Sequence, residues 1–187
     1  MRVFTCEAGL IQEADGSARC RMGETSVVVA VYGPHQARFS RQERYDKATV
    51  DIDFSVCGFA GSEAMELEKR AIAFLEPSLM KAIVLETFPR QVLSLKVTVI
   101  NNDGAVMSCS LHACALALMN AGIDMPCIPS SVTLCASKTC AWKDTNEVDQ
   151  SGDDDDDDDD DSALVFNVDP TFAEEEEADC MVTMAFA

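Results

Sequence analysis

Residues 25–34 read Thr-Ser-Val-Val-Val-Ala-Val-Tyr-Gly-Pro, and this stretch decides the fold class. Its first eight residues are almost all apolar or β-branched, which is typical of a strand that is buried on both faces. Gly33 and Pro34 then predict the end of the strand, because both residue types favour turns. A strand of this kind needs neighbouring strands on both sides and covering elements above and below it.

The residues before this stretch predict a hairpin partner for it. Apolar and polar residues alternate over residues 17–22, which read Ser-Ala-Arg-Cys-Arg-Met. This period of two indicates a half-buried strand. Asp15-Gly16 and Gly23-Glu24 are turn signals at its two ends. An antiparallel pair therefore begins the domain.

The residues after the central stretch predict alternating strands and helices. A helical pattern covers residues 62–86, with Pro77 expected to kink or divide it. A second and very apolar helix covers residues 106–121, and Gly122 is its expected C-cap. The further predicted strands are residues 48–56, 92–100, 131–137, 163–168 and 180–186. We expect an α+β fold in which helices are layered on a mixed sheet.

One domain accounts for the whole chain, residues 1–187. That length, with 48% hydrophobic residues, suffices for one sizeable core. The apolar stretches are too short to span a bilayer, and the N-terminus has no apolar segment of a secretory signal. We therefore expect a soluble intracellular protein that does not bind a membrane.

The net charge of −19 is distributed unevenly along the chain. Residues 1–100 hold 12 Lys and Arg against 13 Asp and Glu, whereas residues 101–187 hold 2 against 20. Nine consecutive aspartates, residues 153–161, account for half of the later excess. Because such a run repels itself and buries no apolar surface, we expect residues 143–162 to form a disordered acidic insertion loop. The run lacks the spaced ligands and the glycine of a calcium-binding loop.

The nine cysteines predict neither a disulfide framework nor a zinc site. Their number is odd and no two of them form a CxxC pair, so a reducing compartment fits better. Most of them lie in apolar stretches, where a free cysteine behaves as a small core residue. We expect no metal and no cofactor.

A series of short motifs occurs in a fixed order along the chain. Each motif is weak by itself, but together and in this order they are specific. They are Asp15-Gly16-Ser17-Ala18, Gly23-Glu24-Thr25-Ser26-Val27, Val31-Tyr32-Gly33-Pro34, Phe88-Pro89-Arg90, Asp103-Gly104, Asn120-Ala121-Gly122-Ile123 and Val168-Asp169-Pro170-Thr171. With these motifs the chain resembles the RNase PH family, and among its members the ring subunits of the eukaryotic RNA exosome.

The resemblance implies a two-layer βαβα fold and a place in a six-membered ring of RNase PH-like subunits. Expected partners are the other ring subunits, RNA-binding cap subunits and RNA that is threaded through the ring. The implied function is structural support of 3′-to-5′ RNA processing and degradation, including rRNA maturation, in the nucleus (nucleolus) and the cytoplasm. Relatives continue past residue 187 into a helical region, so we also expect an uncovered apolar surface that needs a partner.

The phosphate site of active relatives is altered in this sequence. In those relatives Asp-Gly is followed by Gly-Thr-Arg, whose hydroxyl, guanidinium and helix N-terminus bind phosphate. The corresponding remnant here is Gly104, Ala105, Val106, Met107 and Ser108. Val106 and Met107 have no side-chain donor, and each charged hydrogen bond lost costs roughly 1.5–3 kcal/mol. Ser108 either meets an anion or, as we favour, is an ordinary residue of the first helical turn.

The second part of the family's site is a pair of acidic residues. The resemblance places Glu175 near the first carboxylate and Asp179 near the second, with the spacing shortened by two residues. A retained acid can protonate a leaving oxygen or hold Mg²⁺, but four successive glutamates are equally typical of a solvated face. We treat both residues as weak catalytic candidates.

Two further sets of residues allow a functional and a structural interpretation. His112 follows Ser108 by one helical turn, but without an acidic residue nearby in sequence we favour a core or subunit-contact histidine. A basic set contacts either RNA phosphates or a neighbouring subunit. Its members are Arg19, Arg21, Arg38, Arg41, Arg44 and Lys47.

Three hypotheses about function remain from the sequence. The leading one is a non-catalytic structural subunit of the exosome ring. The alternatives are a phosphorolytic 3′-to-5′ exoribonuclease whose site is shared with a partner subunit, and a metal-dependent hydrolytic nuclease. Only phosphorolysis requires inorganic phosphate and releases nucleoside diphosphates, so phosphate dependence separates the two alternatives.

Overall fold

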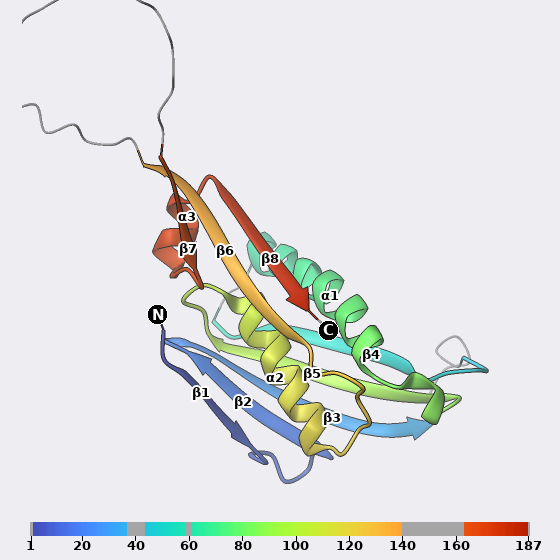
Figure 1. Cartoon of the computed structure of the whole chain (residues 1–187). Coiled ribbons are helices and arrows are strands. Elements are labelled where there is room, and N and C mark those ends of the chain that lie inside the picture. Colours follow the sequence, from blue (N-terminus) through green and yellow to red (C-terminus); the bar gives the residue numbers. More distant parts are fainter. Residues whose placement is uncertain (1, 37–43, 59–60, 140–162, 187) are drawn as a thin grey trace, which may run out of the picture.

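A five-stranded mixed sheet forms the base of the structure, a computed structural model that describes residues 2–36, 44–58, 61–139 and 163–186. The strand order is β1-β2-β3-β5-β4; β4 and β5 are parallel and all other neighbours are antiparallel. The chain enters at the edge strand β1 (Figure 1). The strands are β1 (Phe4–Ala8), β2 (Gly16–Met22), β3 (Thr25–Gln36), β4 (Thr49–Val56) and β5 (Gln91–Asn101).

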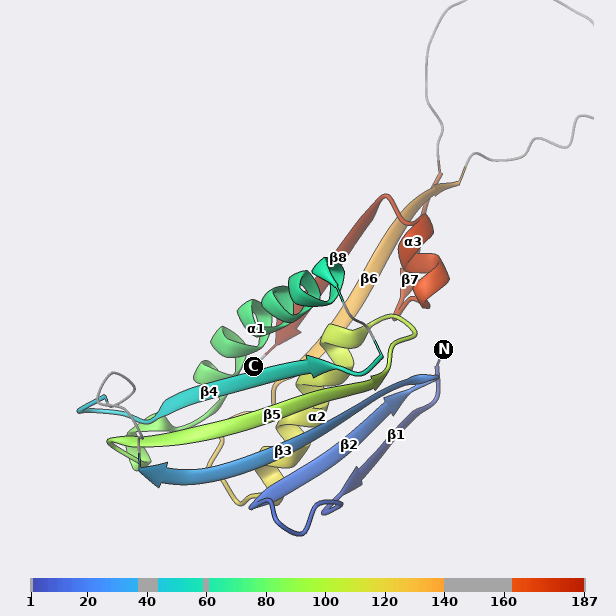
Figure 2. The ribbon, with the colours of Figure 1, turned by 180° about the vertical axis from the view of Figure 1, so that it is seen from behind.

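Three helices and a second, smaller sheet complete the fold. The second sheet is antiparallel, with the strand order β7-β6-β8. Figure 2, from behind, shows the face of the five-stranded sheet that is turned away from α1 and α2. The elements are α1 (Ser62–Ala82), the short 3-10 helix η1 (Leu85–Thr87), α2 (Val106–Asn120), β6 (Ser130–Thr139), β7 (Ala163–Val168), α3 (Phe172–Glu177) and β8 (Cys180–Phe186).

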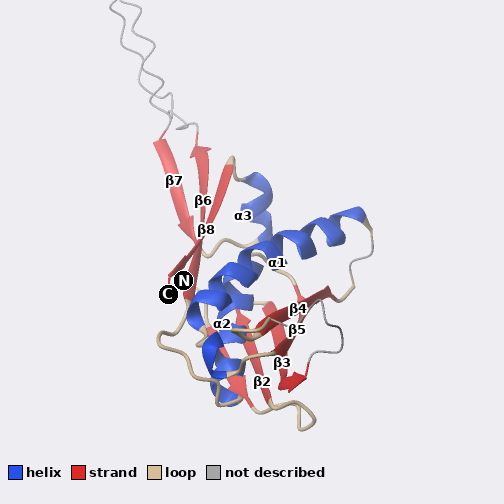
Figure 3. Cartoon of the chain, turned by 90° about the vertical axis from the view of Figure 1, so that its right-hand side faces the viewer, coloured by secondary structure: helices blue, strands red, loops and turns tan. Residues whose placement is uncertain are grey.

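Helix α2 lies between the two sheets (Figure 3). It packs on β2 and β3 of the first sheet and on β6 of the second. Ten of its 15 residues are buried, as expected for a helix that is covered on two sides. Close contact is possible because Gly16 has no side chain: a Cβ there would lie 2.4 Å from the Ala117 carbonyl oxygen. The C-terminal end of α2 therefore packs closely against β2.

The observed elements confirm the predicted fold class and most of the predicted elements. The predicted strand over residues 25–32 has a fully buried centre, Val27, Val29 and Val31. Gly122 follows α2 in the left-handed conformation, with φ of 72°, as its expected C-cap role requires.

Two predicted element ends were wrong. Helix α1 ends at Ala82 and runs undivided through Pro77, which excludes the division that we considered beside a kink. Strand β3 does not end at Gly33-Pro34; it continues to Gln36 across an irregularity in its pairing with β5. A second sheet, in addition to the predicted mixed sheet with its helices, covers α2 on the side away from the first.

Exposed apolar side chains gather on the second sheet. Its strands β7 and β8 carry six large ones that are at least 40% exposed. These are Phe166, Val168, Met181, Val182, Met184 and Phe186. Exposed apolar surface of this extent is typical of a region that contacts another molecule.

Two predictions concern residues outside the described part of the chain. The predicted acidic insertion, residues 143–162, lies there, and so do Arg38 and Arg41. Among the helices that the structure does describe, none combines the length and the apolar character needed to cross a bilayer.

Candidate functional site

The turn that precedes α2 is held by the side chain of Thr25, from β3, and by that of its own residue Asn102. The Thr25 hydroxyl accepts a hydrogen bond from the Asp103 N–H at 3.1 Å and donates one to the Gly104 carbonyl oxygen at 2.7 Å. The side chain of Asn102 accepts a further bond from the Gly104 N–H at 3.1 Å. Ala105, the N-cap residue, then adopts a left-handed conformation with φ of 51°. This turn is the segment in which the sequence placed the remnant of a phosphate site.

Gly104 lies against the chain that enters α3. A Cβ at this position would be 2.4 Å from the Pro170 carbonyl oxygen and 2.7 Å from the carbonyl carbon of Thr171. Its φ of 84° is also a conformation that favours glycine. Because Gly104 has no side chain, the turn before α2 can contact the chain that enters α3. These two segments are about 70 positions apart in the sequence.

Glu175 uses this contact to reach the turn. Its carboxylate oxygen Oε1 accepts a hydrogen bond from the Ala105 backbone N–H at 2.6 Å. The helix begins directly after this amide, where unpaired N–H groups and the helix dipole favour a negative charge. A carboxylate of the protein itself thus occupies a position at which active relatives present donors to phosphate.

The environment of Glu175 shifts its proton affinity. Burial raises the pKa of Glu175 above its usual value, and the charge of Asp103 raises it further. The hydrogen bond from Ala105 and the positive charge of Arg2 act in the opposite direction. Burial dominates, so this carboxyl holds a proton more tightly than a solvated glutamate.

Helix α3 places Glu175, and the sequence contains a signal for it that we missed. The Thr171 hydroxyl accepts a bond from the Glu174 N–H at 3.3 Å, and the Glu174 carboxylate accepts one from the Thr171 N–H at 2.7 Å. These reciprocal bonds are a capping box, and they lower the pKa of Glu174. The pattern Thr-x-x-Glu predicts a helix start, whereas we considered the glutamates only as retained acids or as a solvated face.

Arg2 places a positive charge beside this turn. Its guanidinium nitrogen Nη2 donates a hydrogen bond to the Asp103 carbonyl oxygen at 2.7 Å and lies 3.7 Å from the Asp103 carboxylate. Its side chain is only 12% exposed, and its Nη1 is buried without a hydrogen-bond partner among the described residues. Arg2 therefore balances the charge of Asp103 through one of its two terminal nitrogens.

The structure separates Ser108 from the solvent. Its hydroxyl lies 2.7 Å from the Thr133 hydroxyl of β6, which in turn lies 3.2 Å from the Thr183 hydroxyl of β8. Ser108 is fully buried in this chain of hydroxyls between α2 and the second sheet. The geometry agrees with the ordinary packing role that we favoured and offers an anion no access.

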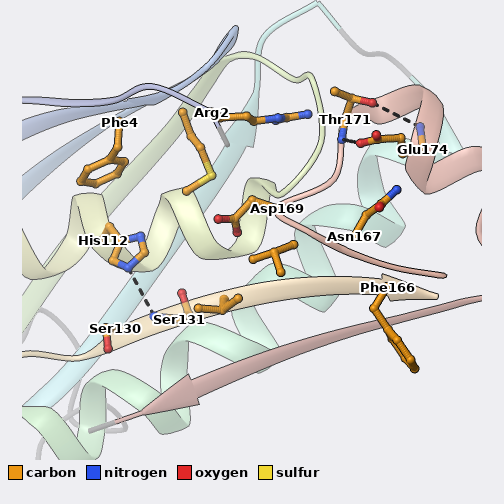
Figure 4. Close-up of a pocket in the computed structure, with 13 residues that line it drawn as sticks. Arg2, Phe4, His112, Ser130, Ser131, Phe166, Asn167, Asp169, Thr171 and Glu174 are labelled. Atoms are coloured by element: carbon orange, nitrogen blue, oxygen red, sulfur yellow. Dashed lines mark hydrogen bonds between the residues drawn. The ribbon is translucent and has the colours of Figure 1, made fainter.

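A cavity of about 880 Å³ lies beside the turn, between α2, β1 and the second sheet (Figure 4). The His112 ring lines it, and its Nε2 accepts a hydrogen bond from the Ser131 N–H at 3.3 Å. The Phe4 ring contacts the His112 ring edge-on, with the two ring centroids 5.4 Å apart. Burial lowers the pKa of His112, while the charge of Asp169 opposes this shift. His112 bonds to Ser131 and not to Ser108, so the predicted packing role describes it better than a Ser–His pair.

Asp179 follows α3 and comes directly before β8. Its side chain is exposed, and its backbone N–H donates to the Ala136 carbonyl oxygen at 3.1 Å. Of the two predicted acids, the structure brings Glu175 to the remnant of the phosphate site. Among the described residues, no group of three or more His, Cys, Asp or Glu is arranged to hold a metal ion.

The four described members of the basic set lie on two separate strands or their approaches. Arg19 and Arg21 lie on β2, whereas Arg44 and Lys47 precede β4, which is separated from β2 by β3 and β5. Arg19 is engaged with the Ser26 hydroxyl at 3.2 Å. A contact of these residues with RNA or with a subunit stays a prediction.

Comparison with known proteins decides the family. Residues 1–124 match the RNase PH profile, described as domain 1 of a 3′ exoribonuclease family. The chain belongs to this family. The predicted RNase PH fold is therefore confirmed, and the turn before α2 lies inside the matched region.

Several similar proteins are components of the RNA exosome. The chain is 31% identical over 157 residues to the exosome complex component RRP41 homolog of Arabidopsis thaliana, covering 81% of this chain and 65% of that protein. It is 31% identical over 144 residues to the exosome complex component rrp46 of Schizosaccharomyces pombe, covering 76% of this chain and 59% of that protein. The chain thus spans between about half and two thirds of the curated relatives it matches.

Solved structures of RNase PH proteins share the fold of this chain. The crystal structure of Rrp46 from rice (Oryza sativa) has a TM-score of 0.75 and 24% identity, and the match covers 100% of this chain and 74% of that one. An archaeal exosome core has a TM-score of 0.66 and 19% identity, with coverage of 98% and 70%. The likeness includes the second sheet and α3, which lie outside the family match.

Proposed function

We propose that the chain is a non-catalytic, structural subunit of an RNA exosome ring, where it supports 3′-to-5′ RNA processing and degradation, including rRNA maturation. Its relatives are named as exosome components, and the exposed apolar side chains on its second sheet suit a subunit that assembles with others. The partners we propose are other RNase PH-like ring subunits, RNA-binding cap subunits and RNA in the ring. We place this assembly in the nucleus, including the nucleolus, and in the cytoplasm.

One observation carries the non-catalytic part of this proposal. The Glu175 carboxylate accepts the Ala105 N–H at the entrance to α2, the position where a phosphate would need donors. Val106 and Met107 add no side-chain donor, and Arg2 is engaged with Asp103. A phosphate approaching this turn meets like charge and few free donors.

The assembly part is tested by recovering the tagged full chain from its own cells under gentle conditions. We expect it to elute from gel filtration in a large complex with other RNase PH-like subunits and cap proteins identified by mass spectrometry. Elution as a single chain, or as a homo-oligomer without these proteins, would contradict the proposal. A single chain would leave the apolar surface on β7 and β8 exposed to water, so it is the less stable arrangement.

The catalytic part is tested on the same complex with a 3′-labelled single-stranded RNA, in the presence and absence of inorganic phosphate. We expect the Glu175→Gln variant to degrade RNA at the rate of the wild-type complex. A second candidate function keeps Glu175 as a general acid, because its pKa is raised. Phosphate-dependent release of nucleoside diphosphates that is lost in Glu175→Gln would favour this candidate and exclude ours.

A further inference from the structure

Two cysteines face one another across the first strand pair. Cys6 of β1 and Cys20 of β2 are direct partners in the antiparallel register, and their Sγ atoms lie 3.3 Å apart. Cys20 is fully buried, whereas Cys6 on the edge strand is exposed. An oxidant from solution can therefore reach one sulfur of the pair but not the other.

We propose that Cys6 and Cys20 form an oxidisable dithiol, in which a peroxide first oxidises Cys6 and Cys20 then closes a cross-strand disulfide. This modification site is independent of the ring assembly proposed above. It depends on the register of β1 and β2 and on the difference in exposure between the two thiols.

The two steps balance as follows. The Cys6 sulfur attacks one oxygen of the peroxide, the O–O bond breaks, and Cys6 becomes a sulfenic acid while a hydroxide or alkoxide leaves and takes up the thiol proton. The Cys20 sulfur then attacks the Cys6 sulfur, the S–OH bond breaks, and water leaves with the Cys20 proton. In total the two thiols lose two protons and two electrons, and the peroxide is reduced to water and a second water or an alcohol.

The geometry suits the second step. Residues directly opposite in an antiparallel pair have Cα atoms about 4.5–5.5 Å apart, within the range of about 4.4–6.8 Å that disulfides span. The two sulfurs need to close from 3.3 Å to a bond of about 2.0 Å. Rotation of the exposed Cys6 side chain supplies this movement without displacing the core.

The surroundings of Cys20 set the order of the steps. Burial raises the pKa of the Cys20 thiol, and the neighbouring cysteines add to the effect. Cys109, on α2 behind it, donates to the Cys20 carbonyl oxygen at 3.6 Å, and burial raises its pKa to about 12. Neither buried thiol presents a thiolate to solution, so neither reacts first. Cys20 acts only once a sulfenic acid is formed beside it.

The disulfide would covalently attach the edge strand to the sheet. All five residues of β1 are exposed, so backbone pairing with β2 contributes most of what holds this strand. Edge strands are the part of a sheet that opens most easily. Oxidation would therefore limit the opening of β1, and with it the access to the cavity that Phe4 lines.

The test treats the purified full chain with hydrogen peroxide, blocks remaining thiols with an alkylating reagent and digests it with trypsin without reduction. Cleavage after Arg19 and Arg21 separates Cys6, in peptide 3–19, from Cys20, in the dipeptide 20–21. We expect mass spectrometry to find these two peptides joined, with the loss of two hydrogens, and a dithiol reductant to separate them. The matched control is Cys57→Ser, which removes another exposed cysteine.

The variants make the outcome decisive. The linked peptides should persist in Cys57→Ser and disappear in Cys6→Ser, an exposed position where serine leaves the core unchanged. Cys20→Ser, with a sulfenic-acid probe added, should trap Cys6 as the labelled sulfenic acid. The proposal is overturned if Cys6 of the wild-type chain accumulates as sulfinic acid while Cys20 is recovered alkylated, that is, as a thiol that never reacted. It is also overturned if Cys6 is linked to another cysteine or to a second chain.

Discussion

The Glu175 carboxylate accepts a 2.6 Å hydrogen bond from the Ala105 backbone N–H, across 70 positions of sequence. This bond connects the acidic segment of the family's site to the segment that binds phosphate in active relatives. Here the acid satisfies the amide directly. The contact therefore supports the fold and places a carboxylate where, under the proposed function, it keeps phosphate away, and these two effects are separable by substitution.

Removing the Glu175 side chain should destabilise the chain. Glu175→Ala leaves the Ala105 N–H without its acceptor, and an unsatisfied buried donor costs about 1–3 kcal/mol. We expect a decrease of that size in the free energy of unfolding, measured by urea denaturation at neutral pH. Glu176→Ala is the matched control, because Glu176 is exposed on the same helix. Equal stability of the two variants would show that the bond contributes nothing.

Glu175→Gln keeps an oxygen that can accept the hydrogen bond but removes the titrating carboxyl, so this variant should change how stability depends on pH. Burial raises the pKa of Glu175 above its ordinary value of 4.5, so the folded chain binds this proton more tightly than the unfolded chain. The contribution of this group to stability is therefore fully present below pH 4.5 and is lost as the pH rises through the raised value. As the pH rises through the raised pKa of Glu175, the free energy of unfolding of Glu175→Gln should therefore increase relative to that of the wild type. Denaturation curves at several pH values test this, and a difference independent of pH would contradict it.

The sequence predicted the elements whose pattern is local. The buried strand over residues 25–32 and the helix over 106–121 both follow from runs of apolar residues bounded by Gly and Pro. Strand β1 carried no such signal, because all five of its residues are exposed. Helix α3 did carry one, the capping box at Thr171, but four consecutive glutamates concealed it.

The site was only partly predictable for a similar reason. The missing donors at Val106 and Met107 are visible in the sequence once the resemblance is recognised. The bond from Ala105 to Glu175 is not, because no local rule brings residues so far apart together. The same holds for the hydroxyl pair of Ser108 and Thr133, which depends on the second sheet packing on α2.

Gly104 should tolerate no side chain, and Gly58 provides a matched control. Both residues have φ of 84°, so an alanine meets the same backbone strain at either position. At Gly104 the new Cβ also meets the Pro170 carbonyl oxygen at 2.4 Å, whereas at Gly58 nothing lies within 4 Å. We expect Gly104→Ala to be less stable than Gly58→Ala by about 1–3 kcal/mol, the usual cost of forced overpacking. Thermal denaturation compares the two, and equal melting temperatures would mean that the entry to α3 moves away freely.

His112 should make the chain less stable in mild acid. Burial lowers the pKa of His112 below its ordinary value of 6.5, so the unfolded chain takes up this proton at a higher pH than the folded chain. The free energy of unfolding should therefore fall as the pH drops below 6.5, by no more than about 1.4 kcal/mol per pH unit for one group. His112→Gln should remove that part of the slope.

His35→Gln is the control for this titration. His35 is the other histidine of the chain and is exposed at the end of β3, so His35→Gln tests, between pH 7 and pH 5, the loss of a histidine that is not buried. Chemical denaturation of the wild type and both variants across this range measures the three slopes. If His112→Gln and His35→Gln alter the slope equally, burial of the His112 ring is not its cause. If neither alters it, the slope between pH 7 and pH 5 has a source other than the two histidines.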